Sequence, residues 1–238
     1  MIGSRTFTAL AIATSLAFAP TPARAQEAET VEQFWPDANA YVRLNESQRL
    51  WFLVAPVHER NEGLEEIQVG AHWEIGLSPR WRAARLGEMY DADRLRYLRF
   101  RAGIRYSASL EESNDDEEWR GILELTPRAG LPGDIVGAFR NRGDLRWING
   151  DFSWRYRPRL WLEREFSIAT HVALVPYGSA EIFYDSRYEA WTRTRYQFGV
   201  AVPVSKAFAP EVYVSRQRDE EPTLKYTNAL GLVLGFFF

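Results

Sequence analysis

Apolar and polar residues alternate along most of this chain with a period of two. In the stretch RLRYLRFRAGIRYSASL, every second residue from Leu98 to Leu110 is apolar. The positions between them include Arg99, Arg101 and Arg105. Successive side chains of a β-strand point to opposite faces, so this pattern predicts a strand with one apolar face and one basic face.

The same alternation recurs in further runs along the sequence. They include EIQVGAHWEIGL, DFSWRYRPRLWLERE, HVALVPYGSAEIFY, AWTRTRYQFGVAV and the stretch from Leu224 onward. Clusters of Gly, Pro, Asn and Asp separate the runs and are typical of turns. No stretch of the sequence shows a clear helical period of 3.6. The pattern therefore predicts an all-β chain, with one domain over residues 26–238.

The first residues have the features of an export signal. Arg5 supplies a positive charge, the apolar run FTALAIATSLAFA follows, and Ala23 and Ala25 give a small-x-small cleavage pattern. We expect residues 1–25 to be a signal peptide that is cleaved before Gln26. The alternative is an N-terminal membrane anchor, for which the apolar run is short. No later stretch is apolar for about 18 residues, so we expect no transmembrane helix in the mature chain.

Two folds fit strands with one apolar and one polar face. A soluble periplasmic sandwich or barrel buries the apolar face, whereas a membrane barrel turns that face to lipid. Strands of about 10 to 15 residues, charged residues in mid-strand and the export signal favour the membrane barrel. Aromatic residues near strand ends are typical of interfacial girdles. The candidates for this girdle are Trp35, Trp51, Trp73, Trp81, Trp119, Trp147, Trp154, Tyr184, Tyr188 and Trp191.

We therefore predict a single antiparallel transmembrane β-barrel in the cell outer membrane. Ten strands are clear, and one or two more would lie around residues 81–86 and 135–140. Single-chain bacterial barrels have even strand numbers, so twelve strands are favoured over ten. The expected surroundings are outer-membrane lipid and lipopolysaccharide.

The chain ends on LGLVLGFFF, a final strand that is apolar at every second position. This ending resembles the C-terminal signal that outer-membrane proteins present to the barrel-assembly machinery. A closing strand must pair with the first strand, because lipid cannot satisfy free backbone groups. The alternative is an ordinary last strand of a periplasmic β protein. The predicted assembly signal comprises Tyr226, Leu230, Leu232, Leu234, Phe236 and Phe238.

Three segments carry a resemblance to a known family. VPYGSAEIFYD, RTRYQFGVAVPVSKAF and WRYRPRLWLER resemble an outer-membrane β-barrel family known as domain of unknown function 2490. The resemblance covers roughly residues 32–238 and implies a barrel with an outer-membrane address, but no known activity. Its marks are Tyr177, Glu181, Phe183, Arg193, Arg195 and the terminal Phe238.

The polar phase of the strands predicts a charged lumen in which arginine outnumbers carboxylate. One interpretation is a plug of salt-bridged side chains that fills a narrow barrel, with pairs such as Glu181 and Arg195. The other is a narrow channel that prefers anions. The predicted lumen charges are Glu74, Arg99, Arg101, Arg105, Glu124, Arg155, Arg157, Arg159, Glu163, Glu181, Arg193 and Arg195.

Composition narrows the remaining function classes. The chain has no cysteine, which excludes disulfides and thiolate metal sites, and its formal net charge of -3 gives no indication of nucleic-acid binding. No metal or phosphate-loop motif occurs, so we expect no cofactor. Only His58, His72 and His171 are available as histidine bases, and no GxSxG motif occurs. We predict no enzymatic activity, and keep a lipid-modifying enzyme and a soluble periplasmic protein as alternatives.

Overall fold

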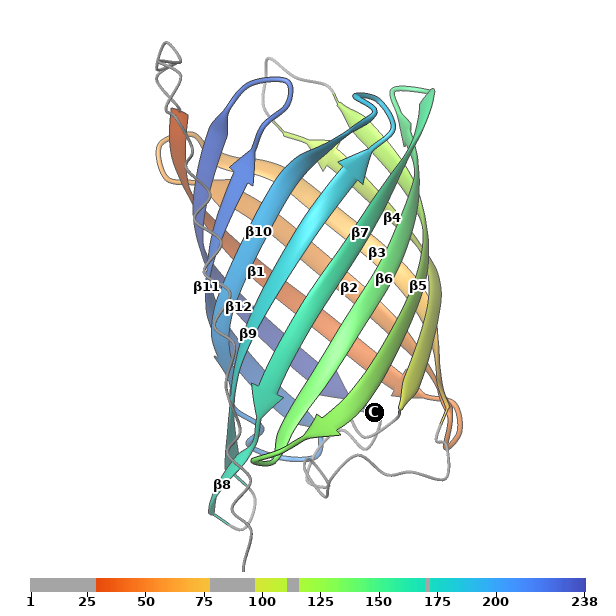
Figure 1. Cartoon of the computed structure of the whole chain (residues 1–238), viewed down its shortest axis with the longest axis vertical. Coiled ribbons are helices and arrows are strands. Elements are labelled where there is room, and N and C mark those ends of the chain that lie inside the picture. The colour runs from red at the N-terminus through yellow and green to blue at the C-terminus, as the bar shows by residue number, and fades with distance from the viewer. Residues whose placement is uncertain (1–28, 78–96, 111–115, 170–171) are drawn as a thin grey trace, which may run out of the picture.

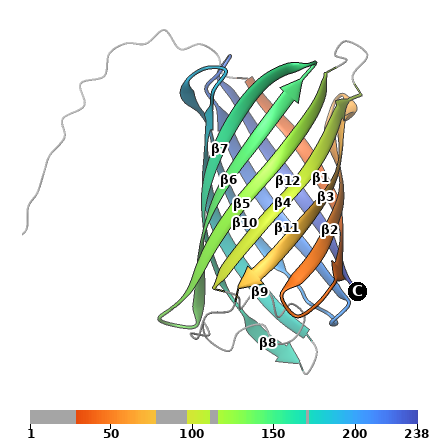
Figure 2. The same cartoon turned by 90° about the vertical axis from the view of Figure 1, so that its right-hand side faces the viewer.

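The computed structural model describes residues 29–77, 97–110, 116–169 and 172–238. Its strands wrap around one axis and close into a barrel (Figures 1 and 2). The predicted signal peptide over residues 1–25 and the strand expected around 81–86 lie outside the described residues. The strands are β1 Glu29–Arg43, β2 Gln48–Glu59, β3 Gly63–Leu77, β4 Leu98–Ser109, β5 Glu117–Leu131, β6 Ile135–Ile148, β7 Asp151–Arg164, β8 Phe166–Ala169, β9 Val172–Asp185, β10 Ala190–Ala201, β11 Phe208–Asp219 and β12 Lys225–Phe237.

The all-β barrel predicted from the alternation is confirmed, with one difference in its closure. Twelve strands occur in the described residues, and eleven of them form the wall. An up-and-down wall with an odd number of strands brings its first and last strand together in the same direction. β1 accordingly pairs with β12 in parallel, from Glu29 opposite Lys225 to Tyr41 opposite Phe237. This parallel seam replaces the even-numbered, wholly antiparallel closure that the sequence predicted.

The twelfth strand, β8, lies beside the start of β9. β9 pairs with β8 at its first residues, where Leu174 lies opposite Phe166, and with β7 beyond them, where Tyr177 lies opposite Glu163. β8 thus continues the pairing of β9 past the point where β7 ends. The stretch around 135–140, an optional strand from the sequence, is the first half of β6.

Local turn chemistry explains how long antiparallel pairs form. β6 and β7 are joined by Asn149 and Gly150, whose φ angles are 52° and 91°. Positive φ at both central residues is the signature of a type I′ hairpin, whose twist matches that of the flanking strands. Gly and Asn adopt this backbone region most readily, so the Asn-Gly pair sets the β6–β7 register.

The two faces of the wall differ in the way that the alternation predicts. Apolar side chains point outward and are exposed, as for Ile104 (58%), Leu123 (54%) and Phe198 (63%). Charged side chains point inward and are buried, as for Glu74 and Glu124, each 2% exposed. A soluble β-barrel has the opposite arrangement, with its apolar residues in the core.

β12 is held to β11 by tight side-chain packing and to β1, across the seam, by backbone hydrogen bonds. A Cβ atom built on Gly231 of β12 would lie 2.0 Å from the ring of Tyr213 on β11, so the ring occupies the space that a side chain would need. The amide of Phe238 donates to the carbonyl of Tyr41 at 2.8 Å, and the amide of Arg43 donates to the carbonyl of Phe238 at 2.9 Å.

The two ends of the barrel are distinguished by the chain segments that lie there. We call the end where β12 finishes the Phe238 end, and the opposite end, where β1 begins, the Glu29 end (Figure 1).

The described residues include no helix that is long and apolar enough to cross a membrane.

Candidate functional site: the charged lumen

Ion pairs run from strand to strand around the inside of the wall. Glu74 of β3 pairs with Arg49 of β2 and Arg101 of β4, and Arg101 also reaches Glu124 of β5 at 3.2 Å. Arg140 of β6 lies 3.9 Å from Glu124.

The same series of ion pairs continues across β7 and β9. Glu181 of β9 pairs with Arg140 and, at 2.9 Å, with Arg157 of β7. Arg157 lies 3.3 Å from Asp144, which accepts from Arg142 at 2.6 Å. We call this series the ion-pair chain. Its members are Arg49, Glu74, Arg101, Glu124, Arg140, Glu181, Arg157, Asp144 and Arg142.

Burial shows that the ion-pair chain fills its part of the lumen. Glu124 and Glu181 are each 2% exposed, Asp144 is 1% exposed, and Arg142 is 4% exposed. Side chains that lined a wide aqueous channel would be accessible to water. Instead each carboxylate is shared by several guanidinium groups, the arrangement that offsets the cost of burying charge.

The ion pair expected between Glu181 and Arg195 takes a different form. Glu181 and Arg195 lie directly opposite in the β9–β10 register, but the ion-pair partners of Glu181 are Arg140 and Arg157. Arg195 instead donates to Gln217 at 2.9 Å. The ion pairs of Glu181 thus differ from the predicted Glu181–Arg195 pair, because arginines from the adjoining strands β7 and β6 reach the carboxylate along the same side of the wall.

His72 is held by ring packing. Its ring stacks on Trp51 with 4.4 Å between centroids, and neither of its ring nitrogens has a hydrogen-bond partner among the described residues. A Cβ atom on Gly103 would lie 2.1 Å from His72 Nδ1, so the glycine makes room for the ring.

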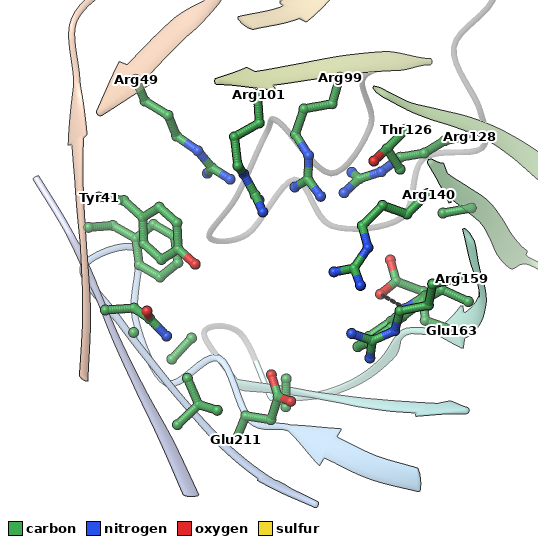
Figure 3. A pocket seen from close by; sticks show the side chains of 18 residues that line it. Tyr41, Arg49, Arg99, Arg101, Thr126, Arg128, Arg140, Arg159, Glu163 and Glu211 are labelled. Carbon is green, nitrogen blue, oxygen red and sulfur yellow. Dashed lines mark hydrogen bonds between the residues drawn. The ribbon is translucent and has the colours of Figure 1, made fainter. Parts of the chain in front are cut away.

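Near the Phe238 end, the lumen opens into a cavity of about 320 Å³. We call it the basic cavity, because its described lining holds six arginines and two glutamates. Figure 3 shows the arginine side chains converging on it from several strands. The charged lining residues are Arg49, Arg99, Arg101, Arg128, Arg140, Arg159, Glu163 and Glu211.

Arg159 of the basic cavity is fixed by neutral groups. It donates to Ser179 Oγ at 2.9 Å and to Gln197 Oε1 at 2.6 Å. Its guanidinium carbon lies 4.5 Å from the ring centroid of Trp161. Trp161 in turn stacks on Tyr177 at 3.9 Å between centroids. These contacts set the direction of Arg159 without neutralising its charge.

Near the Glu29 end, a cavity of about 710 Å³ has the opposite composition. We call it the acidic cavity, because its described lining holds five carboxylates and two arginines: Glu65, Glu66, Asp116, Glu118, Asp151, Arg146 and Arg187. A third cavity of about 380 Å³, the seam cavity, lies against β1, β2, β11 and β12 at the same end, and Glu65 and Glu66 line both.

All twelve predicted lumen charges lie on the inward phase of their strands, but they divide among several places. Arg99, Arg101, Arg159 and Glu163 line the basic cavity. Arg105, Arg193 and Arg195 line the seam cavity. Arg155 pairs with Asp185 at 2.6 Å. Glu74, Arg101, Glu124, Arg157 and Glu181 belong to the ion-pair chain.

Several buried charges were missed by the sequence analysis. β6 contributes Arg140, Arg142, Asp144 and Arg146, all inward. Their period-two spacing carries the same signal as β4 does, so they could have been found. Arg49 of β2 gives a weaker signal, because it is a single charge at the start of an apolar run.

The predicted aromatic girdle is divided between the two faces. Trp119, Trp147, Trp154 and Trp191 are outward and between 42% and 53% exposed. They lie in the strand segments nearest the Glu29 end. Trp35 and Trp51 instead face the lumen, where Arg195 lies over Trp35 at 5.0 Å and Arg101 over Trp51 at 4.2 Å. Trp81 lies outside the described residues.

The predicted assembly-signal residues share the outward face at the end of the chain. Leu230 is 49% exposed, Phe236 is 38% exposed and Phe238 is 74% exposed, whereas Thr227 and Ala229, on the opposite face of the same strand, are buried in the lumen. Tyr226, Leu232 and Leu234 have the same phase and are partly exposed.

Comparison with known proteins gives one match. The family model described as protein of unknown function (DUF2490) matches residues 32–228. Comparisons with curated proteins and with solved structures each gave no match.

Proposed function

The chain belongs to the family described as protein of unknown function (DUF2490), and from that premise we propose that it is a structural outer-membrane β-barrel with a closed lumen. The observation that carries this proposal is the inversion of its faces. Each exposed apolar side chain that enters hydrocarbon contributes about 25 cal/mol per Å² of buried apolar surface. In water the same surface would be an aggregation liability.

The aromatic residues near the Glu29 end support a membrane position. Trp147 contacts Phe152 at 5.4 Å between ring centroids, and Tyr184 contacts both Trp154 and Trp191 at 5.3 and 5.7 Å. Amphipathic rings gather at the level of lipid head groups, where one edge is apolar and the other is wet.

The buried ion-pair chain supports a closed lumen. Glu74 and Glu124 are shielded from water between the basic cavity and the Glu29 end. A narrow anion-preferring pore is the second candidate, favoured by the six arginines of the basic cavity. The two candidates differ in whether ions cross the ion-pair chain.

Spin labels can test the membrane position directly. The chain has no cysteine, so one introduced cysteine is a unique attachment point. We expect a label at Ile104→Cys in lipid vesicles to collide with oxygen but not with a water-soluble nickel chelate. The matched control is Glu32→Cys, at an exposed rim position, where the nickel chelate should dominate. Equal nickel access at both sites, or release of the protein by osmotic shock, would favour a soluble periplasmic protein.

Conductance separates the two candidates. We expect the refolded chain to be silent in a planar bilayer, because the ion-pair chain excludes water. Discrete anion-selective steps would establish the pore instead. In that case Arg99→Gln, Arg101→Gln and Arg195→Gln together should change conductance or selectivity, since these charges line the two cavities that ions would enter.

We also propose that the barrel is exported and is not an enzyme. N-terminal sequencing of the membrane-bound protein should start at Gln26, as cleavage after Ala25 predicts. Mass spectrometry of lipid A from cells with and without the protein should give identical spectra; a changed species would revive the lipid-modifying alternative. Deletion of Phe238 should slow insertion by the assembly machinery if β12 carries the assembly signal.

A further inference from the structure

We propose that the basic cavity is a binding site for a phosphate group. This inference goes beyond the proposed function and requires only that the barrel is folded. It rests on three described arginines of the lining, Arg99, Arg140 and Arg159, and on those of their N–H donors for which no described residue is an acceptor.

Arg99 has the weakest attachment of these arginines. Its carboxylate contacts, to Glu74 and to Glu124, are at 3.7 Å, and its Nε atom has no hydrogen-bond partner among the described residues. Its side chain is only 16% exposed. A guanidinium has five N–H donors in a planar fork, so Arg99 offers donors that the carboxylates do not use.

Two further arginines of the cavity also have one N–H donor without a described partner. The Nε atoms of Arg140 and Arg159 are buried and have no hydrogen-bond partner among the described residues. Arg159 is also bonded only to the neutral Ser179 and Gln197. At Arg99 and Arg159 the cavity therefore combines unused donors with positive charge that no hydrogen-bonded carboxylate among the described residues offsets.

The geometry favours an oxyanion with several acceptor oxygens. Figure 3 shows Arg99 and Arg101 side by side on one side of the cavity, with Arg140 and Arg159 on an adjoining side. A tetrahedral phosphate accepts from several guanidinium forks at once, whereas a chloride ion accepts without directional matching. The volume of about 320 Å³ far exceeds the roughly 10–15 Å³ that one water requires.

The phosphate could come from a free ion or from a lipid head group. A site at the end of a membrane barrel is open to both sources, and they share the same chemistry at the arginines. The experiment must therefore contain one arm for each source.

The first arm measures binding of inorganic phosphate to the full mature chain refolded in a non-ionic detergent, by calorimetry at constant ionic strength. We expect saturable binding, weakened roughly tenfold or more in Arg99→Gln/Arg159→Gln, because two forks are lost. Arg187→Gln is the matched control, since it removes the same charge at the acidic cavity, and should bind as the unsubstituted chain does. Arg159→Lys tests the fork and should bind with intermediate affinity.

The second arm uses detergent micelles that contain phosphatidic acid or, as control, phosphatidylcholine, and follows the ³¹P resonance of the lipid. A shift with phosphatidic acid that Arg99→Gln/Arg159→Gln abolishes identifies a lipid head group as the source. Absence of binding in both arms, with far-UV circular dichroism showing a folded barrel, would overturn the proposal. So would equal affinity in the double variant. Neither outcome depends on bilayer insertion or conductance, so failure here is distinguishable from failure of the closed-barrel proposal.

Discussion

The described lining of the basic cavity at the Phe238 end holds six arginines and two glutamates, whereas that of the acidic cavity at the Glu29 end holds five carboxylates and two arginines. Both ends are built from the same eleven strands, so the fold does not cause the difference. It arises from the charges that particular strands place at each end: β2 and β4 supply Arg49, Arg99 and Arg101 to the basic cavity, whereas β3 supplies Glu65 and Glu66 to the acidic cavity. A barrel wall can thus carry two chemically distinct sites, and the ion-pair chain separates them.

The largest expected effect is the loss of a shared carboxylate at the Phe238 end. Glu74→Gln removes the partner of Arg49 and Arg101 in a water-excluded region. Breaking a buried ion pair leaves uncompensated charge, and we expect the free energy of unfolding in urea to fall by about 3–5 kcal/mol. A fall below about 1 kcal/mol, the value typical of exposed pairs, would show that water reaches this region.

The next effect concerns the packing between β11 and β12, beside the seam. Gly231→Ala should force the Tyr213 ring out of its position, because the new Cβ would overlap it. Overpacking of this kind costs about 1–3 kcal/mol. Heat-modifiability on gels would report the lost stability, and Gly143→Ala is the control, since its Cβ would meet no described atom within 4 Å. Equal behaviour of the two variants would contradict the packing of the Tyr213 ring on Gly231.

A smaller effect is expected for a carboxylate at the Glu29 end. Glu118→Gln loses contacts to Arg120 and Arg146, but Arg146 keeps Asp185 at 2.8 Å as a partner. We expect a loss of about 1–3 kcal/mol in the free energy of unfolding, less than for Glu74→Gln. A larger loss than at Glu74 would reverse the comparison between the two ends.

The smallest effect is expected at the rim of the Glu29 end. Glu32 and Arg60 form an ion pair in which both side chains are more than half exposed. Exposed pairs contribute about 0–1 kcal/mol and are screened by salt. Glu32→Gln should therefore leave the urea midpoint nearly unchanged at high salt, and a marked shift there would indicate that the rim is not solvated.

The sequence by itself determined the strand character and the two faces of the wall. The period-two alternation of β4 and β7 placed Arg99 and Arg157 inside and Ile104 and Leu160 outside, because a strand alternates its side chains whatever its neighbours are. The family resemblance was also readable from local segments.

Only the tertiary structure decided which charges meet. The partners of Glu181 come from β6 and β7, and Trp51 packs on His72 inside the lumen. Such contacts depend on the register between strands and on the curvature of the wall. Neither can be read from the sequence of one strand. The eleven-strand wall and its parallel seam were likewise decided by the tertiary structure, since they depend on β8 staying outside the wall and on β1 pairing with β12. Local alternation assigns a residue to a face, and closure of the barrel assigns its partners.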